Sequence, residues 1–560
     1  MAHEDHRRSK VKTPSSRRWK FTAALAAFGL AGALMAGCAS GAGASSAGGS
    51  GEPKQGGDLT FLINNFDAGW VANESAISSY EGNVWDSITD KLVYVDPDGN
   101  ISPWLAESWE NNSDSTEFTL HLKNGVTFSD GTAFDAAAVV RNLDYWARGD
   151  EAKGVKRIGL FPSSTYQTAE AVDDSTVKVT FNAPTLGFIP TLGYHGSILT
   201  SPKTLDLSKE QQADLKNYSG TGPFVVDSWT EGDNVVLKKR DDYNWAYDNA
   251  KHTGPAYLDT ITYKIVKEDS IRSSSVESGQ ADVAYNISPQ EISRLKSAGF
   301  TVETPKYLGF SHGFKVSTKA ENFDDVRVRQ AVQVGIDRDE ILQTVYTDDW
   351  DKATSFLQSN VPEATDNSDL LTYDKAKAES LLDEAGWVKG ADGVRTKDGK
   401  TLDLDLYPTT YINTASQIDE IIARQLGDIG FKVTQQKLDT AAYLDRVDTN
   451  PAIPLRDVTR SFIDVGTVAG VLTSAKSGED WFAVGESDAK LNELSSGIAT
   501  ASDEAQRKTL VAELQRYVLE QGYYIPIEQI VQRIYLETPK LHGVSFNGIA
   551  YANFYDAWKE

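Results

Sequence analysis

Residues 105–134 read LAESWENNSDSTEFTLHLKNGVTFSDGTAF. Apolar and polar residues alternate over 117–122, which predicts a strand with one buried face. Gly125 and Gly131 predict two turns, because glycine accepts backbone angles that other residues avoid. We expect the aromatic residues near these turns to pack against a hydrophobic core.

The same strand pattern recurs along the chain, at 177–181 and 261–265, and a first strand is expected over 54–63. Other stretches carry apolar residues at helical spacing and then reach a glycine, which commonly ends a helix. No internal repeat is visible, so the sequence predicts a mixed α/β fold. The predicted helices cover 374–385, 418–429 and 510–518.

Composition limits the classes of function. The 560 residues include 80 Asp and Glu against 55 Lys and Arg, a formal net charge of −25. This length predicts several domains, and the negative charge argues against nucleic acid as the main partner. The single cysteine excludes an intrachain disulfide and any metal site with several cysteines.

The N-terminus is typical of an export signal. Basic residues precede an apolar run over 21–36 that is too short to span a bilayer. Leu34-Met35-Ala36-Gly37 then precedes Cys38 and resembles a bacterial lipobox, with Cys38 lipidated as the mature first residue. We therefore expect a signal peptide over 1–37, a flexible tether over 38–55 and an extracytoplasmic protein held at the cell membrane by lipid. Arg17-Arg18 leaves twin-arginine export as an alternative to the general route.

Signals of catalysis are missing from the sequence. It has no Gly-x-Ser-x-Gly or His-Glu-x-x-His motif, and Gly399-Lys400-Thr401 lacks the first glycine of a phosphate loop. Gly220-Thr221-Gly222 lacks the third glycine of a dinucleotide site. The seven histidines share no metal-ligand spacing. We expect no cofactor, no metal and no enzyme, although a hydrolase with paired carboxylates remains an alternative.

Several segments, in the same order, resemble family 5 of the bacterial extracellular solute-binding proteins, the peptide- and nickel-type receptors of ABC importers. The matches run from about residue 56 to Trp558. Besides 105–134, the matching segments are Gly220-Thr221-Gly222-Pro223-Phe224, Asp242-Tyr243-Asn244-Trp245, 257–261 with 277–282, and 326–338.

This resemblance implies a two-lobed fold of the periplasmic-binding-protein type II class, in three domains. Two crossing strands near Lys306 and Tyr524 would form a hinge. The implied protein is a monomer that captures a short peptide between its lobes and delivers it to permease and ATPase subunits. The implied domains are I (56–95, 217–306 and 523–560), II (96–216) and III (307–522).

The resemblance also suggests ligand-binding residues. Asp464 follows an apolar stretch at the place where relatives carry an aspartate for the α-ammonium of a peptide, and a plain loop or cap aspartate is the alternative. Asp464→Ala is then expected to abolish peptide binding without unfolding the protein. For the aromatic candidates, ordinary core packing is the alternative. The other candidates are Asn65, Phe66, Asp67, Trp70, Tyr407, Thr409, Tyr411, Trp481 and Phe482.

The sequence does not identify the ligand, and three hypotheses remain. A short peptide is the first hypothesis. An oligosaccharide, a nickel chelate or an opine-like compound on the same scaffold is the second, and an extracytoplasmic hydrolase is the third.

Overall fold

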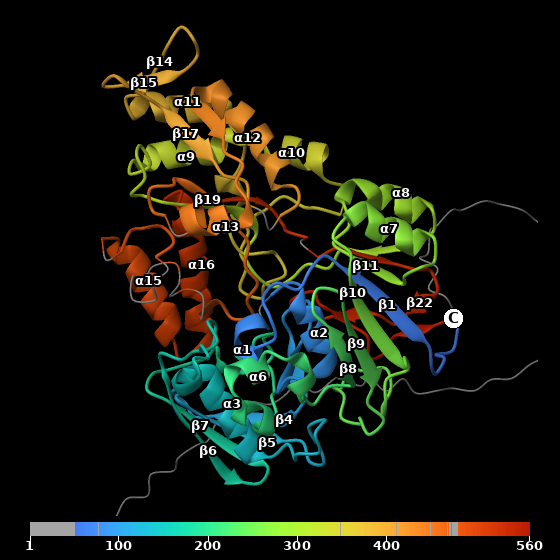
Figure 1. Cartoon of the computed structure of the whole chain (residues 1–560). Coiled ribbons are helices and arrows are strands. Elements are labelled where there is room, and N and C mark those ends of the chain that lie inside the picture. The colour runs from blue at the N-terminus through green and yellow to red at the C-terminus, as the bar shows by residue number, and fades with distance from the viewer. Residues whose placement is uncertain are drawn as a thin grey trace, which may run out of the picture.

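The computed structural model describes residues 51–560, apart from 77, 348, 410, 411, 449, 467, 468, 470, 471, 473–479, 486 and 532. The predicted signal over 1–37, Cys38, most of the tether and Tyr411 lie outside the described residues. The described chain is mixed α/β, as the sequence predicts, and forms two lobes (Figure 1). We call residues 58–303 with 535–559 lobe 1, and residues 312–528 lobe 2.

A seven-stranded mixed sheet organises lobe 1. Its central strand β1 pairs in parallel with β10 and with β11, and β8, β9, β12 and β21 extend the sheet with antiparallel pairs. The sheet therefore joins three separate parts of the chain. Its strands in spatial order are β12 (Thr301–Glu303), β21 (Tyr535–Glu537), β11 (Val283–Tyr285), β1 (Asp58–Ile63), β10 (Thr260–Ile265), β9 (Asn234–Lys239) and β8 (Phe224–Thr230).

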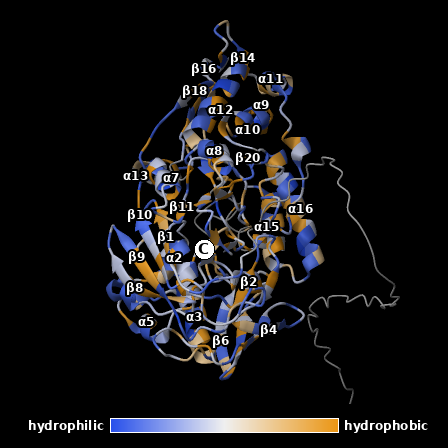
Figure 2. Ribbon diagram, turned by 90° about the vertical axis from the view of Figure 1, so that its right-hand side faces the viewer, coloured by the Kyte–Doolittle hydropathy of each residue, from blue (hydrophilic) through white to orange (hydrophobic). Residues whose placement is uncertain are grey.

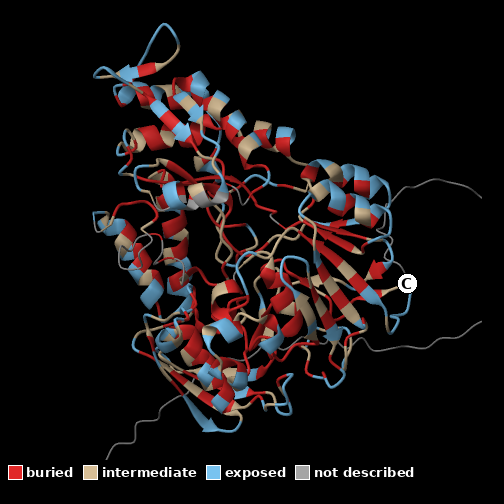
Figure 3. Cartoon of the chain, in the orientation of Figure 1, coloured by how far each residue is buried: buried red, intermediate tan, exposed pale blue. Residues whose placement is uncertain are grey.

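Helices and small ladders complete this part of lobe 1. Strands β1, β11 and β21 of the sheet are largely buried, whereas α7 and α8 show many exposed residues on the outside (Figure 3). The helices are α1 (Ala72–Ser75), α2 (Glu81–Ile88), α7 (Asp269–Glu277) and α8 (Ile292–Ser297). The ladders are β2 (Val93–Val95) with β3 (Ile101–Pro103), β22 (Leu541–His542) with β25 (Trp558–Lys559), and β23 (Ser545–Phe546) with β24 (Ala552–Asn553).

A second, antiparallel sheet occupies the bottom of lobe 1 in Figure 1. Its strand order is β4 (Ala106–Asn111), β5 (Glu117–Leu122), β7 (Thr176–Phe181) and β6 (Tyr166–Asp173). The accompanying helices are α3 (Ala136–Arg148), α4 (Phe188–Thr191), α5 (Pro202–Asp206) and α6 (Lys209–Gln212).

The first motif folds as its sequence predicts. On β5 the side chains of Phe118, Leu120 and Leu122 are buried. Gly125 and Gly131 have φ angles of 78° and 79°, in the left-handed region that favours glycine. After the second turn, the Asp135 side chain accepts a hydrogen bond of 2.9 Å from the backbone N–H of Ala138 and caps α3.

The glycines of the 220–224 motif serve close backbone packing. A β-carbon on Gly222 would stand 2.4 Å from the carbonyl carbon of Ile88 at the end of α2. We expect Gly222→Ala to lower the free energy of unfolding by about 2–3 kcal/mol, because the backbone at Gly222 or at Ile88 and Thr89 must move to make room for the added carbon. Urea unfolding tests this. Gly159→Ala is the control, since nothing lies within 4 Å of the added carbon, and an equal loss in both variants would contradict the packing argument.

Lobe 2 has a three-stranded antiparallel sheet and several helices. The sheet places β13 (His312–Val316) between β19 (Leu455–Val458) and β20 (Tyr524–Glu528). Hydrophobic and hydrophilic residues interleave along α11 and α12, as one-sided burial requires (Figure 2). The helices are α9 (Val326–Gly335), α10 (Arg338–Val345), α11 (Lys375–Glu384), α12 (Ala415–Ile429), α13 (Thr440–Tyr443), α15 (Ala489–Thr500) and α16 (Glu504–Glu520).

Short strands lie at the outer end of lobe 2. They are the parallel pair β17 (Asp403–Leu406) and β18 (Lys432–Gln435), and the meander β14 (Val388–Lys389), β15 (Arg395–Lys397) and β16 (Lys400–Thr401). The predicted helices over 374–385, 418–429 and 510–518 fall within α11 and its flanking residues, α12 and α16. Gly430 ends α12 with a φ of 112°.

Two segments connect the sheets of the lobes. Residues 304–311 lead from β12 in lobe 1 to β13 in lobe 2, and residues 529–534 lead back from β20 to β21. One hydrophobic cluster continues across the junction and includes Phe310, Phe462 and Tyr524 together with lobe 1 residues. The lobes are thus in contact. Across the described ranges, no helix is both long enough and apolar enough to cross a membrane.

Candidate ligand site between the lobes

The segment that follows β19 lies where the two lobes meet. Ser461 forms a β-bridge with Gly309, and the Phe310 N–H donates a 3.0 Å hydrogen bond to the Arg460 carbonyl. From lobe 1, the backbone comes so close that a β-carbon on Gly187 would stand 2.1 Å from Oδ2 of Asp464. A small pocket lies here, lined by Leu160, Thr191 and Tyr194 of lobe 1 and by Phe462, Ile463 and Asp464 of lobe 2.

Asp464 is held in a buried ion network. Its Oδ1 accepts a hydrogen bond from Nη2 of Arg507 on α16, and Nε of Arg507 lies 3.1 Å from Oε1 of Glu363. The side chains of Asp464 and Arg507 are only 4% and 8% exposed. Burial raises the pKa of Glu363, and the Arg507 charge opposes that rise. The carboxylate proposed to meet a ligand ammonium therefore already has a cationic partner.

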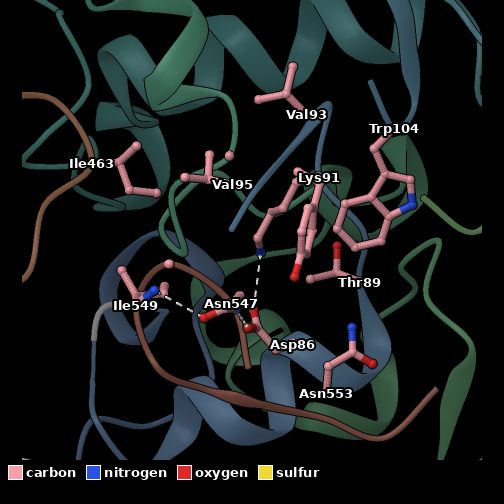
Figure 4. A pocket seen from close by; sticks show the side chains of 13 residues that line it. Asp86, Thr89, Lys91, Val93, Val95, Trp104, Ile463, Asn547, Ile549 and Asn553 are labelled. Atoms are coloured by element: carbon pink, nitrogen blue, oxygen red, sulfur yellow. Dashed lines mark hydrogen bonds and ion pairs between the residues drawn. The ribbon is translucent and has the colours of Figure 1, made fainter. Parts of the chain in front are cut away.

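A larger pocket opens between the same segment and lobe 1 (Figure 4). Its floor contains Asp86 of α2 and Lys91, which point toward each other in Figure 4 with Asn547 beside them. Lys91 Nζ lies 3.6 Å from Asp86 Oδ1, and Asn547 donates to Oδ2 of Asp86. Ile463 of lobe 2 also lines the pocket. Residues distant in sequence thus share one polar cavity at the lobe junction.

Burial shifts the pKa values of the two charged residues at the bottom of this pocket. It lowers the pKa of Lys91 and raises the pKa of Asp86, and the attraction between the two groups opposes both shifts. The Lys91 ammonium makes no hydrogen bond. Lys91 and Asp86 thus present two opposite charges to the pocket, each stabilised by the other.

The candidates after the first strand occupy one loop on lobe 1. Asn65 and Phe66 are half-buried and Asp67 is exposed, whereas Trp70 is 3% exposed. The Trp70 ring packs 5.1 Å from the ring of Phe66 and 5.7 Å from that of Trp85, between ring centroids. Trp70 therefore anchors the loop in the core, and Asn65 and Asp67 keep surface that a solute could contact.

The remaining candidates lie in lobe 2. Tyr407 is half-buried, and the N–H of buried Thr409 donates a 2.9 Å hydrogen bond to Asp457. Trp481 packs 5.0 Å from the ring of Phe310, and Phe482 stacks 5.2 Å from the ring of Tyr523. Both aromatic side chains contribute to the interior of lobe 2.

The named positions are thus spread along the junction and through the lobe interiors. Arg507, Asp86 and Lys91 are not among the candidates named from the sequence. Nothing in their local sequence marks them, because each gains its role from a partner elsewhere in the fold. Within the part of the chain that the structure describes, no group of three His, Cys, Asp or Glu side chains has an arrangement that could hold a metal ion.

Comparison with known proteins places this geometry in a family. The model for bacterial extracellular solute-binding proteins, family 5 (middle region), matches residues 100–474. The glutathione-binding protein GsiB of Escherichia coli K12 is 28% identical over 425 residues, which cover 74% of this chain and 73% of that protein.

Solved structures agree in fold. NikA from Brucella suis, crystallised with Fe(III)-EDTA, superposes with a TM-score of 0.75 at 21% identity, over 90% of this chain and 100% of that one. AppA, the oligopeptide-binding protein of Bacillus subtilis in complex with a nonapeptide, gives 0.72 at 21% identity, over 91% and 100%. These likenesses confirm the two-lobed periplasmic-binding-protein fold. The chain is a binding protein rather than an enzyme, and it belongs to family 5 of the bacterial extracellular solute-binding proteins.

Proposed function

We propose that this protein is the extracytoplasmic receptor of an ABC importer, which captures short peptides between its lobes and delivers them to a membrane permease and its ATPase. A lipid on Cys38 would hold it at the cell membrane. The observation that carries the proposal is the polar cavity at the lobe junction, where residues of both lobes meet. A solute that contacts both lobes favours the arrangement that brings them together.

The proposed mechanism is hinge closure. Domain I would comprise 56–95, 217–306 and 523–560, domain II 96–216 and domain III 307–522, with the hinge near Lys306 and Tyr524. Support comes from the two segments that connect the seven-stranded sheet to the lobe 2 sheet. Because few backbone torsions connect such lobes, rotation there can open and close the junction without disturbing either core.

Relatives supply the support for a peptide ligand. The names of GsiB and AppA state that they bind glutathione and oligopeptides. Among the proposed contact residues, Asn65, Asp67 and Tyr407 keep exposed or half-buried polar side chains. Asp464, Phe66 and Thr409 are further members of the set, with Trp70, Trp481 and Phe482 supporting it from the interior. Tyr411 is also proposed as a contact and lies outside the described residues.

A thermal-shift screen of the mature protein tests the ligand class. At a hundredfold excess over Kd, a di- to pentapeptide ligand should stabilise the folded protein by about 2.7 kcal/mol. Small-angle scattering of the same sample should show a smaller radius of gyration on binding. Oligosaccharides and nickel chelates are the comparison ligands. Stabilisation by these comparison ligands alone would contradict the peptide proposal. Chemical turnover of a bound compound, measured by mass spectrometry, would contradict the role as a binding protein.

A further inference from the structure

Gly187 of lobe 1 lies against the side chain of Asp464 in lobe 2. Outside the adjoining residues, the three atoms nearest to a β-carbon on Gly187 would all belong to Asp464: Oδ2 at 2.1 Å, Cγ at 2.4 Å and Oδ1 at 2.9 Å. The backbone at Gly187 has a φ of −73° and a ψ of 1°, angles that other residues also adopt. The missing side chain therefore serves the approach of the two lobes and not the local turn.

Asp464 cannot turn away from this contact without losing others. Its Oδ1 accepts a hydrogen bond from Nη2 of Arg507, and the two side chains are only 4% and 8% exposed. Gly466 leaves the carboxylate little room, because a β-carbon there would lie 3.0 Å from Oδ2 of Asp464. We therefore expect a side chain at position 187 to separate the lobes rather than to displace Asp464.

A second glycine of lobe 1 meets lobe 2 close to the same arginine. A β-carbon on Gly99 would lie 2.6 Å from Cγ of Pro362, although Gly99 also serves its own turn with a φ of 78°. Pro362 adjoins Glu363, whose Oε1 lies 3.1 Å from Nε of Arg507. Arg507 is thus paired with Asp464 at one contact between the lobes and with the residue that follows Pro362 at the other.

We propose that the contact between Gly187 and Asp464 is a closure stop, which forms when the lobes come together and sets how far they close. Arg507 is the residue that positions the carboxylate for it. This inference rests on the proposed capture of a solute between the lobes and adds a determinant of the closed state. Because only glycine at position 187 permits that state, a larger residue would lower the fraction of molecules that can hold a solute with both lobes.

A disulfide across the closure stop tests the contact without any solute. The β-carbons of residues 187 and 464 lie within disulfide reach, since Cγ of Asp464 is 2.4 Å from the β-carbon position at Gly187. Cys38 is the only natural cysteine, so a Cys38→Ser background leaves no other thiol. We expect Gly187→Cys combined with Asp464→Cys to form an intrachain disulfide with diamide as the oxidant, identified by mass spectrometry of the linked peptides.

Gly232→Cys combined with Asp464→Cys is the matched control for the disulfide. Gly232 belongs to the same lobe, and nothing lies within 4 Å of its β-carbon position, so this pair should form no intrachain disulfide. Small-angle scattering should give a smaller radius of gyration for the 187–464 disulfide form than for its reduced form. A 187–464 pair that stays reduced in a folded protein would overturn the closure stop.

A side chain at position 187 tests the effect on solute capture. Gly187→Ala should bind trialanine or pentaalanine at least about tenfold more weakly than the wild type, because the added carbon makes the closed state rare. Gly159→Ala is the matched control and should bind as the wild type does, since Gly159 lies in the same lobe and has nothing within 4 Å of its β-carbon position. Calorimetry measures the affinities, and thermal unfolding checks that both variants fold.

The outcomes separate the closure stop from the peptide proposal. Peptides that bind the wild type and Gly187→Ala equally tightly would contradict the closure stop and leave peptide capture in place. A 187–464 disulfide in a protein whose wild type binds no peptide would support the closure stop and contradict the peptide ligand. A disulfide together with selective loss of affinity in Gly187→Ala would support both.

Discussion

Replacing His312 by leucine is expected to lower the free energy of unfolding by about 3–5 kcal/mol at neutral pH. His312 on β13 lies between two buried carboxylates, with Nδ1 2.7 Å from Oε1 of Glu528 and Nε2 3.2 Å from Oδ1 of Asp457. All three side chains are at most 1% exposed. Leucine would leave two buried carboxylates without a cation, and desolvation makes that arrangement costly.

The same network predicts a distinct pH dependence. Burial alone would lower the pKa of His312, but Glu528 and Asp457 together raise it to about 10. The folded protein thus retains a proton that the unfolded chain loses near pH 6.5. This contribution is complete below pH 6.5 and is lost as the pH rises to 10, by roughly 1.4 kcal/mol per unit in that window.

Urea unfolding of wild type and His312→Leu, at pH 6 and at pH 9.5, measures both effects. The stability difference between the two proteins should be large at pH 6 and much smaller at pH 9.5. His121→Leu is the control, because His121 is exposed on β5 and its loss should change stability by less than about 0.5 kcal/mol. A difference between wild type and His312→Leu that does not depend on pH would refute the charged-histidine assignment.

His312 also illustrates what the sequence could and could not predict. Local patterns predicted β5, α12 and the two turns at Gly125 and Gly131, because alternation, helical spacing and turn glycines act over a few residues. The first strand begins at Asp58 rather than at residue 54. The family resemblance supplied the two lobes, which local pattern alone could not, since β1 pairs with strands about 200 residues away.

The site was harder to predict, because its chemistry depends on partners brought together by the fold. The sequence offers His312 as one of seven scattered histidines, and only tertiary packing brings Asp457 and Glu528 to its two ring nitrogens. Aromatic residues show the same limit. Trp481 and Phe482 suit a ligand stack or a core equally well in sequence, and their contacts with Phe310 and Tyr523 are set by tertiary packing.

Replacing Arg507 by methionine is expected to cost about 3–5 kcal/mol of stability, and Asp464→Ala less, about 2–3 kcal/mol. The order follows from the network. Removing Arg507 takes this cation from buried Asp464 and from half-buried Glu363, whereas removing Asp464 leaves Arg507 paired with Glu363. The family resemblance alone implies an intact fold for Asp464→Ala, and the ion network changes that expectation. Thermal and urea unfolding measure the order directly.

Arg516→Met is the matched control for this series, because Arg516 lies on the same helix and its ion pair with Asp369 is exposed. Its loss should change stability by less than about 1 kcal/mol. A loss for Arg507→Met no larger than that of the control would mean that the buried network contributes little.

The pair also separates a structural role of Asp464 from a ligand role. Asp464→Asn combined with Arg507→Met removes both charges of the buried pair and leaves Glu363 without Arg507, so the double variant should recover part of the stability lost by Arg507→Met. If Asp464 also anchors a peptide ammonium, binding of a peptide that stabilises the wild type must remain weak in the recovered protein. Binding that returns together with stability would assign Asp464 to the framework alone, because a ligand contact depends on the carboxylate itself and not on the fold around it.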